Sequence, residues 1–414
     1  PSEADVVIVN TCGFIEDAKR ESIENILDMI SYKEDCPDLK VLVTGCLAER
    51  YQAEIFKEIP ETDAVIGIGA NEDICDVCNR IISGEKVELF PPKTDLKIEG
   101  DRILTTPPYS AYLKIAEGCS NHCTYCAIPS IRGEFRSRPS ESILQEAQKL
   151  ANEGVKELII VAQDTTRYGE DLYKKNALVP LLKALSMVDG IEWIRLLYLY
   201  PERIDDALID EIANNEKIVK YMDIPLQHIS DKVLDNMHRN VTGQWTRDLI
   251  SRMRERVPGV VLRTTMIVGH PGEGKKDFQE LLSFAEEARF ERLGAFKYSE
   301  EEGTYGAENF KDSISAKTKQ ERLDALMTLQ SEISLAFNQS RVGSEIKVIV
   351  DDFNDGVFVC RSEFESPEVD GEILVRHDSS IMGDVDPYSL IGEFITVKVV
   401  GADEYDLIAE IVEI

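Results

Sequence analysis

The chain has 414 residues, of which 43% are hydrophobic and 30% charged. This composition is typical of a globular protein with two or three domains and excludes a disordered or fibrous chain. The 46 Lys and Arg residues face 77 Asp and Glu, and the resulting net charge of −31 repels nucleic acid and attracts basic partners. No apolar run reaches the about 18 residues of a membrane span, and no signal peptide precedes the first apolar stretch. We therefore expect a cytoplasmic protein whose nine cysteines are reduced and serve metal binding or catalysis.

The N-terminal part of the chain predicts alternating strands and helices. Short apolar runs followed by amphipathic stretches are typical of a parallel sheet that is covered on both faces. The expected strands are residues 6–10, 40–45 and 64–68, and the first expected helix is 14–30. A proline-rich linker is expected over residues 91–108, so the first domain is predicted to cover residues 1–95.

The middle of the chain predicts six further strand–helix units. The expected strands are residues 111–116, 157–162, 193–198, 219–225, 260–269 and 292–298, followed by a long helix over 316–340. Six units are too few for a complete eight-stranded barrel and too many for a small doubly wound sheet. The predicted fold is therefore α/β, with a partial (β/α)6 TIM-like barrel over residues 105–340.

The last part of the chain predicts a small β domain. Short alternating strands are expected at residues 346–350, 357–361, 371–375 and 394–400, with Gly, Asp and Asn in the turns between them. This pattern predicts a C-terminal antiparallel β-barrel over residues 341–414.

Three cysteines with the spacing CxxxCxxC, Cys119, Cys123 and Cys126, follow the first barrel strand. This is the end of the strand at which α/β folds bind ligands. Three thiolates on one short loop can bind three irons of a 4Fe–4S cluster and leave the fourth iron open to a substrate. The alternatives are a zinc site with His122 as a further ligand, or three unrelated buried thiols.

With Tyr125 directly before its last cysteine, this loop resembles the radical S-adenosylmethionine (SAM) superfamily. Further stretches resemble the methylthiotransferase family within it, namely residues 9–15, 44–47, 128–133, 137–139 and 267–273. The resemblance covers all three predicted domains. It implies an N-terminal methylthiotransferase domain with an auxiliary 4Fe–4S cluster, a radical SAM domain and a C-terminal TRAM barrel.

The resemblance also implies the metal ligands. Cys119, Cys123 and Cys126 match the ligands of the cluster that binds SAM on its open iron. Cys12 and Cys46 match two of the three ligands of the auxiliary cluster. The third family ligand lies in a Leu-Gly-Cys motif that this sequence does not contain. Either the residues carrying it precede this sequence in a longer chain, or the auxiliary cluster is absent. We expect the former, because the predicted sheet also lacks its expected first strand.

Polar residues close two of the predicted barrel strands. Gln163, Asp164 and Thr165 follow the second strand, and Gln227 and His228 follow the fourth. Such residues at a barrel mouth are either part of a site or caps and packing groups of the next element. No catalytic residue is predicted.

Glycines near the end of the fifth strand let the backbone approach a ligand closely, although a turn alone also explains them. The resemblance implies that Tyr125, Gln163, Gly269 and Gly272 contact SAM.

Two further groups are ambiguous. Arg132, Arg136 and Arg138 either hold a carboxylate or phosphate, or form a solvated basic loop. Cys75 and Cys78 form a CxxC in a helical stretch, where a redox or metal role is disfavoured because that motif would need to open a helix after a strand.

The methylthiotransferase family divides between enzymes that modify an adenosine in tRNA and one that modifies an aspartate of small-subunit ribosomal protein S-twelve. From residue 341 onward five Lys and Arg face eighteen Asp and Glu, a net charge of −13. A tRNA-binding barrel should be basic, whereas an acidic barrel suits a basic polypeptide. Residues 198–201 and 403–406 also resemble the ribosomal-protein branch. The predicted activity is therefore aspartate methylthiolation, with tRNA methylthiolation as the alternative, and an iron–sulfur electron carrier or a zinc-containing RNA-binding module less favoured.

The resemblance implies a radical mechanism. A reductant such as flavodoxin or ferredoxin supplies the electron that cleaves SAM, and the deoxyadenosyl radical removes a hydrogen from the aspartate β-carbon. A methylated sulfur is then transferred, and a second SAM supplies its methyl group. The expected partners are the basic ribosomal protein and the electron donor, with no membrane and no nucleic acid as substrate.

Overall fold

The computed structural model describes residues 3–93, 98, 100 and 102–414, so the predicted linker over 91–108 lies partly outside the described residues. The chain forms two compact units, which are described separately. Unit 1 comprises residues 1–100, 117–136 and 299–312, and unit 2 comprises residues 101–116, 137–298 and 313–414. In the described part of the chain, no helix combines the length and the hydropathy that crossing a membrane requires.

Unit 1 contains a parallel sheet with the strand order β1 (Val6–Thr11), β2 (Lys40–Gly45), β3 (Ala64–Ile66) and β4 (Val87–Leu89). The first three strands confirm the prediction. The sequence analysis missed β4, because a strand of three residues is too short to show the alternation of side chains that predicts a strand. The register pairs Thr11 with Gly45, so β1 and β2 end at the same edge of the sheet.

Helices pack against the sheet of unit 1 from both faces. The helices of this unit are α1 (Glu16–Ser31), η1 (Tyr32–Glu34), α2 (Cys46–Tyr51), α3 (Ala53–Glu58), η2 (Ile68–Asp73), α4 (Ile74–Ile82), α5 (Ile128–Arg132) and α13 (Tyr305–Asn309). Side chains alternate along β2, so Val41 and Val43 pack with Ile26 of α1 while Leu42 packs with Val77 of α4. The predicted two-sided parallel sheet is therefore confirmed.

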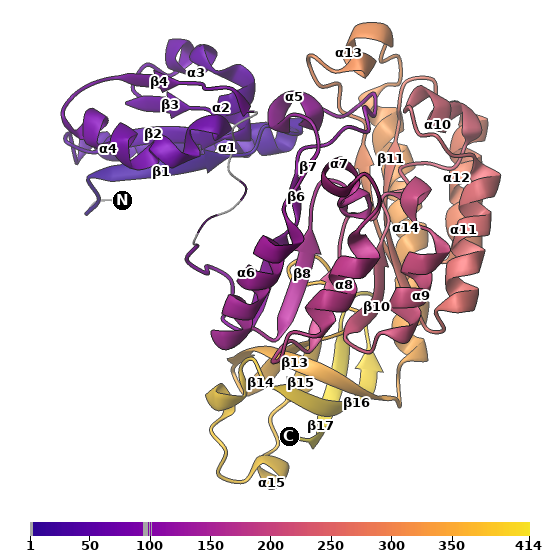
Figure 1. Ribbon diagram of the computed structural model, residues 1–414. Coiled ribbons are helices and arrows are strands. Elements are labelled where there is room, and N and C mark those ends of the chain that lie inside the picture. Colours follow the sequence, from indigo (N-terminus) through magenta and orange to yellow (C-terminus); the bar gives the residue numbers. More distant parts are fainter. Residues whose placement is uncertain (1–2, 94–97, 99, 101) are drawn as a thin grey trace. The chain divides into compact units, whose positions relative to one another are not determined.

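Unit 2 contains the six-stranded sheet of the partial barrel, in the order β12-β11-β10-β9-β8-β5 (Figure 1). Its strands are β5 (Ser110–Lys114), β8 (Glu157–Val161), β9 (Trp193–Leu196), β10 (Ile218–Asp223), β11 (Val261–Val268) and β12 (Arg292–Lys297). All neighbouring strands are parallel. Four of the six lie within the predicted ranges, and β5 and β10 each begin one residue earlier than predicted. The short strands β6 (Ala116–Glu117) and β7 (Arg136–Ser137) precede and follow the cysteine loop in the sequence.

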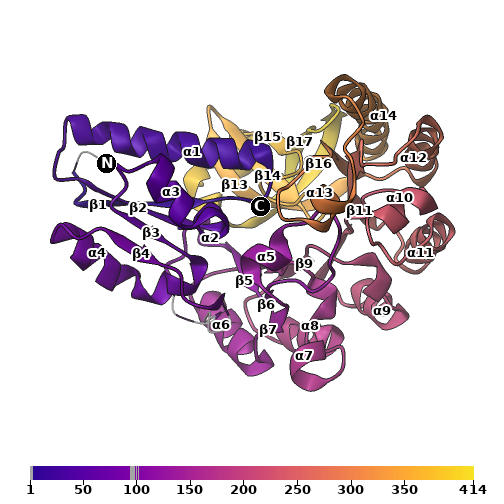
Figure 2. The same ribbon diagram turned by 90° about the horizontal axis from the view of Figure 1, so that it is seen from above.

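Seen from above, the long helices of unit 2 form an arc outside its strands (Figure 2). The helices are α6 (Ser140–Asn152), η4 (Thr165–Arg167), α7 (Glu170–Tyr173), α8 (Leu178–Ser186), η5 (Pro201–Arg203), α9 (Asp206–Asn214), α10 (Asp231–Asn236), α11 (Gly243–Arg256), α12 (Lys275–Ala288) and α14 (Ala316–Ser340). Helix α14 has the predicted bounds, and the hydroxyl of Ser315 caps it by accepting the N–H of Thr318. This arrangement confirms the partial barrel.

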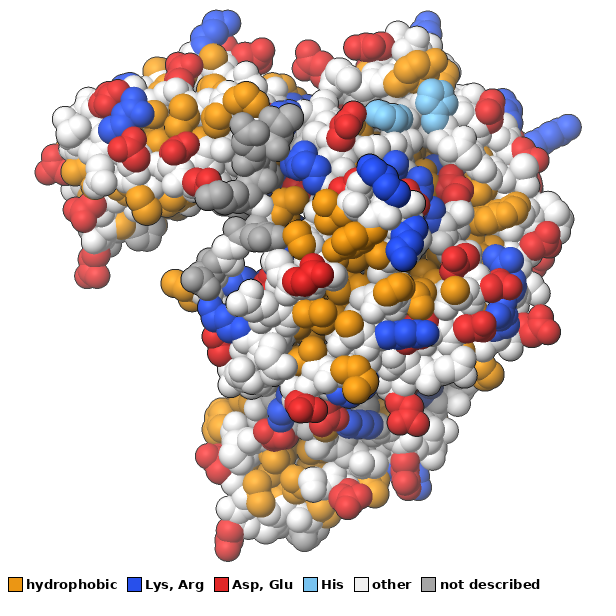
Figure 3. Space-filling model, viewed as in Figure 1, with side chains coloured by type: hydrophobic (Ala, Val, Ile, Leu, Met, Phe, Trp, Pro, Cys, Tyr) orange, Lys and Arg blue, Asp and Glu red, His pale blue; other side chains and the backbone are white. Residues whose placement is uncertain are grey.

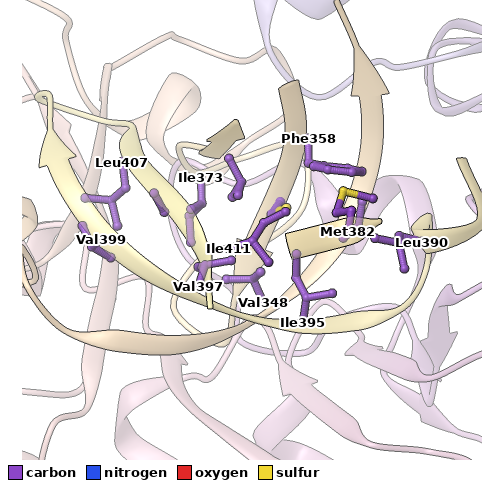
Figure 4. Packing of buried hydrophobic residues seen from close by; sticks show 14 residues of the cluster. Val348, Phe358, Ile373, Met382, Leu390, Ile395, Val397, Val399, Leu407 and Ile411 are labelled. Atoms are coloured by element: carbon purple, nitrogen blue, oxygen red, sulfur yellow. The ribbon is translucent and has the colours of Figure 1, made fainter. Parts of the chain in front are cut away.

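The C-terminal β domain is a closed barrel with the order β13-β14-β15-β17-β16. Its elements are β13 (Glu345–Asn354), β14 (Val357–Ser362), β15 (Ile373–Arg376), α15 (Ser379–Met382), η6 (Pro387–Leu390), β16 (Phe394–Ala402) and β17 (Leu407–Glu413). We missed β17, although Leu407, Ala409 and Ile411 alternate into the core (Figure 4). The barrel departs from a purely antiparallel one because β15 and β17 pair in parallel.

Within unit 2, buried ion pairs join the C-terminal barrel to the (β/α)6 strands. The Glu157 carboxylate at the start of β8 lies 3.0 Å from Arg195 and 3.0 Å from Arg361 of β14, and all three residues are buried. Burial alone would raise the pKa of Glu157, but Arg361 and Arg195 outweigh it and hold the pKa below its ordinary value. Glu365 pairs in the same way with Arg292 and Arg341. Because a buried charge is costly without its partner, replacing one member of these pairs by a neutral residue would destabilise the junction of the two parts.

Candidate functional site

The three cysteines of the CxxxCxxC motif lie in unit 1, on the loop between β6 and α5. The N–H of Cys119 donates to the Gly133 carbonyl (3.1 Å), and the N–H of Cys126 donates to the Cys123 carbonyl (3.0 Å). A Cβ on Gly118, which has a φ of +78°, would lie 2.2 Å from the carbonyl oxygen of Glu134. The start of the loop therefore packs backbone to backbone against its end, and only glycine fits at this position.

The donor chemistry of this loop fits an iron–sulfur cluster. Thiolate sulfur is the ligand that such clusters use, and the loop presents three within eight residues. Cys119 is buried, Cys123 and Cys126 are partly buried, and His122, the candidate zinc ligand, is exposed. Among the described residues no three metal-ligating side chains are already gathered around one point, so the ligand assignment stays a prediction.

Cys12 and Cys46 lie at one edge of the N-terminal sheet. Each directly follows its strand, and the register of β1 and β2 aligns those strand ends. A Cβ on Gly13 would lie 2.8 Å from the backbone of Leu47, so the two cysteine-bearing segments touch. Ser22 of α1 holds Cys12 in place, because its hydroxyl accepts the Cys12 N–H (2.9 Å) and donates to the Cys12 carbonyl (3.0 Å).

Arg132, at the end of α5, links the two cysteine regions of unit 1. Its Nη2 lies 3.1 Å from the Sγ of Cys46, and its Nη1 lies 3.5 Å from the carboxylate of Glu117. Burial would lower the pKa of Arg132, but Cys46, Glu117 and Cys12 outweigh it and raise the pKa. The residue is therefore a partly buried cation beside a predicted metal ligand, and the alternative of a solvated basic loop does not describe it.

Glu301 provides a second link within unit 1, which the sequence analysis missed. Its buried carboxylate lies 2.8 Å from Arg50 and 3.0 Å from Lys19, and Arg50 also donates to the Gly13 carbonyl (2.8 Å). Five residues later the N–H of Gly306 donates to the carbonyl of Thr124 in the cysteine loop (2.7 Å). A run of acidic residues, 300–302, was the only signal in the sequence, and such a run is usually a solvated surface.

Of the remaining predicted site residues, Tyr125 lies on the cysteine loop of unit 1 and is partly buried. The others lie in unit 2, at or just beyond the carboxyl ends of the barrel strands. Gln163 follows β8, and its buried Oε1 has no hydrogen-bond partner among the described residues. Asp164 accepts from Thr166 (2.6 Å) and pairs with Arg203 (3.2 Å), so it organises the turn after the strand. Gln163 is the better candidate for a ligand contact because its acceptor oxygen remains available.

His228 is packed into the fold, but its Nε2 has no hydrogen-bond partner among the described residues, so its role in the site stays a prediction. The residue is fully buried, its Nδ1 accepts the N–H of Ser230 (3.0 Å), and burial lowers its pKa to about 3. Gln227 adopts a left-handed backbone (φ 72°) at the end of β10.

The predicted glycines also have structural reasons. A Cβ on Gly269 would lie 2.4 Å from the side chain of Lys319, and one on Gly272 would lie 2.6 Å from Asn236. Both glycines have positive φ values, +78° and +90°. Glu273 accepts the Gly269 N–H and pairs with Arg322 (3.0 Å), which fixes this turn. The positive φ values and the close neighbours together explain glycine here without a ligand, and the SAM contacts stay a prediction.

The other ambiguous residues have local partners. Arg138 is buried and donates to the Lys114 carbonyl (2.7 Å) and to Glu146 (2.7 Å), which is a structural role within unit 2. Cys75 and Cys78 both lie in α4, as expected, and burial raises the pKa of the Cys78 thiol.

Three family models match the chain along its length. The radical SAM superfamily matches residues 113–285, the TRAM domain matches 342–412, and an uncharacterized protein family, UPF0004, matches 1–67. The predicted domain bounds at residues 95, 105 and 340 remain predictions.

Curated relatives match almost the whole chain. The ribosomal protein uS12 methylthiotransferase RimO of Caldanaerobacter subterraneus subsp. tengcongensis is 51% identical over 99% of this chain and 91% of its own length. RimO of Acetivibrio thermocellus is 48% identical over 99% of this chain and 90% of its own length. RimO of Desulforamulus reducens is 47% identical over 100% of this chain and 92% of its own length. The chain belongs to the RimO family. The methylthiotransferase resemblance is thereby confirmed, and membership of the RimO family implies a 4Fe–4S cluster and SAM through its radical SAM domain.

Solved structures support the same fold. The radical SAM methyltransferase TsrM from Kitasatospora setae, with cobalamin and a 4Fe–4S cluster bound, superposes with a TM-score of 0.55 over 73% of this chain and 65% of its own. At 14% identity this likeness shows the fold alone. The fold described for this chain thus has independent support.

Proposed function

We propose that this chain is a radical SAM methylthiotransferase that adds a methylthio group to an aspartate β-carbon of ribosomal protein uS12, the small-subunit protein S-twelve. The observation that carries the proposal is the identity of 46–51% to proteins named uS12 methylthiotransferase, over at least 90% of their length. A ribosomal protein is made in the cytoplasm, so we place the reaction there.

Cys119, Cys123 and Cys126 would hold the cluster that binds SAM. The backbone contact at Gly118 and the turn between Cys123 and Cys126 hold this loop in a compact form. When bound, the cluster and SAM supply a radical strong enough to remove hydrogen from an unactivated carbon. The chain contributes the three thiolates, and Gln163 offers an acceptor oxygen for a donor group of SAM.

Cys12 and Cys46 would provide two ligands of an auxiliary cluster that carries the sulfur to be transferred. Their strand ends share one edge, and Arg132 donates to the Sγ of Cys46. A hydrogen bond to a ligating sulfur stabilises negative charge on that sulfur, so Arg132 acts as a positioning residue for this site.

The charge of the C-terminal barrel supports a basic polypeptide as substrate. Of its five cations, Arg341 and Arg361 are only 6% and 5% exposed and are neutralised by buried carboxylates. Arg341 and Arg361 pair with Glu365 and Asp351 of the same barrel, so setting these four residues aside leaves three Lys and Arg against sixteen Asp and Glu, and the net charge is still −13. Asp and Glu side chains are spread over the lower part of the molecule, which this barrel forms (Figure 3). An acidic surface attracts a basic protein and repels the phosphates of tRNA.

The proposal is tested by mass spectrometry of uS12. Purified uS12 would be incubated with the anaerobically reconstituted chain, SAM and a reductant such as reduced flavodoxin, and its peptides analysed. A methylthio adduct on one aspartate is expected, and its absence with Cys119→Ala serves as the control. A methylthio group on tRNA adenosine but not on uS12 would instead support the tRNA branch.

A further inference from the structure

A cavity of about 350 Å³ lies within unit 2 between the (β/α)6 strands and the C-terminal barrel. We call it the seam cavity. One wall is formed by β5, the residues before it and β8. The other wall is formed by β13, β14 and part of the loop that follows β14, within residues 367–372. The C-terminal barrel thus contributes side chains directly to a cavity that also borders the catalytic barrel.

The seam cavity carries an excess of negative charge. Asp351, Glu368, Asp370 and Glu372 line it, and Arg361 is its only Lys or Arg among the described lining residues. Arg361 is already neutralised, because it pairs with Asp351 (2.6 Å) and with a buried glutamate of β8. The local field therefore favours a cation.

Two of these carboxylates are available to a ligand. Asp370 is engaged, since it accepts from the hydroxyl of Tyr221 (2.7 Å) and from the N–H of Ser366 (2.9 Å). Among the described residues, by contrast, neither Glu368 nor Glu372 forms an ion pair or a hydrogen bond through its side chain. Both side chains are exposed, so a cation can reach them.

An aromatic side chain lies beside these carboxylates. Tyr112 of β5 is partly buried in the cavity wall, and its pKa is raised by burial and by the nearby Glu368 and Tyr198. A tyrosine next to free carboxylates can pack along the aliphatic stem of Lys or stack on the guanidinium of Arg.

The cavity lies a short distance along the strands from the proposed SAM site. Ile159 of β8 lines the cavity, and Gln163 is four residues further toward the mouth. Four residues of extended chain span about 13 Å. An extended peptide could therefore place one side chain in the cavity and, about four residues away, a second at the mouth.

We propose that the seam cavity binds a Lys or Arg side chain of the polypeptide substrate, with Glu368 and Glu372 pairing its charge and Tyr112 packing on its stem. This inference rests on the proposed function, and it makes the C-terminal barrel part of the substrate-binding site. It also assigns the recognition of basic polypeptides to one cavity instead of to the whole acidic surface of the C-terminal barrel.

The test is a binding titration of purified uS12 against the full chain and its Glu368→Gln/Glu372→Gln variant. We expect the variant to bind about tenfold more weakly at low salt, which is about 1.4 kcal/mol. The difference should nearly vanish at about 1 M salt, where the screening length is about 3 Å. Unfolding temperatures of both forms would show that the substitutions leave the fold intact.

Glu410→Gln/Glu413→Gln is the matched control, because it removes the same charge from exposed positions of β17 in the same barrel. It should bind uS12 within about twofold of the unaltered chain. Equal binding by the cavity variant and this control would overturn the inference while leaving the proposed function intact, provided that the unaltered chain binds uS12. If the unaltered chain does not bind uS12, both fail.

Discussion

The guanidinium of Arg132 lies 3.1 Å from the Sγ of Cys46, although 86 residues separate them in the sequence. Arg132 ends the short helix that follows the CxxxCxxC loop, and Cys46 follows a strand of the N-terminal sheet. One side chain therefore joins the two regions of unit 1 that carry the predicted metal ligands. Its second amino group faces Glu117, which directly precedes the loop.

The Arg132–Glu117 pair should stabilise unit 1 even without metal. We expect Arg132→Met to lower the free energy of unfolding of the apo protein, because it takes a cation away from a carboxylate that is only 1% exposed. In a double-mutant cycle with Glu117→Gln, the coupling should be about 1–3 kcal/mol. Urea unfolding measures it. The control is Arg80→Met, which removes an exposed cation of α4 that pairs with Glu85, and it should cost much less than Arg132→Met because solvent screens this pair.

Gly118 should tolerate no side chain. Gly118→Ala forces a Cβ to within 2.2 Å of the Glu134 carbonyl and also strains a φ of +78°. Gly84 has a φ of +91°, and no atom lies within 4 Å of the Cβ that Gly84→Ala would add. This control therefore introduces only the backbone strain of a positive φ, which costs about 1–2 kcal/mol. Thermal unfolding should therefore show a larger loss for Gly118→Ala, and iron uptake should fall only in that variant. Equal losses would mean that the packing of the loop is not what requires glycine.

Cys119 should be necessary for the iron that supports SAM cleavage. After anaerobic reconstitution, Cys119→Ala is expected to lose the cluster absorbance of this loop and to form no deoxyadenosine from SAM. Cys75→Ala removes an exposed thiol of α4 and should keep both properties. Iron analysis and chromatography of the products measure them. If Cys119→Ala keeps its cluster and its cleavage activity, the ligand assignment is wrong.

Glu365 should make the free energy of unfolding of unit 2 depend on pH in the acidic range. Burial would raise its pKa, but Arg341 and Arg292 lower it from 4.5 to about 2. A depressed carboxyl pKa stabilises the fold above about pH 4.5, and this contribution is lost as the pH falls toward 2. Glu365→Gln should cost about 3–5 kcal/mol at pH 7, because it leaves two buried arginines without their counter-charge, and should flatten the pH dependence in that window. Urea unfolding between pH 3 and 7 tests this, with the exposed Glu413→Gln as the control.

Much of the site could be predicted from local spacing. The thiols of Cys119, Cys123 and Cys126 are close in sequence, so their shared loop follows from the chain itself. Cys12 and Cys46 were assigned by resemblance, and the parallel register of β1 and β2 explains why they meet. The roles of Glu301 and Arg50 could not be predicted, because 251 residues separate this pair and neither residue belongs to a motif.

The sequence by itself determined the element types, the partial barrel, the C-terminal β-barrel and the cysteine loop, because periodicity and spacing are local properties of the chain. The tertiary structure alone decided which charges are neutralised. Arg361 and Arg341 count as surface cations in the composition, yet the fold buries them against Glu157, Asp351 and Glu365. Burial and pairing depend on residues brought together from distant parts of the chain. The composition therefore shows that the C-terminal barrel is acidic, and only the fold shows that two of its free carboxylates, Glu368 and Glu372, lie at the seam cavity.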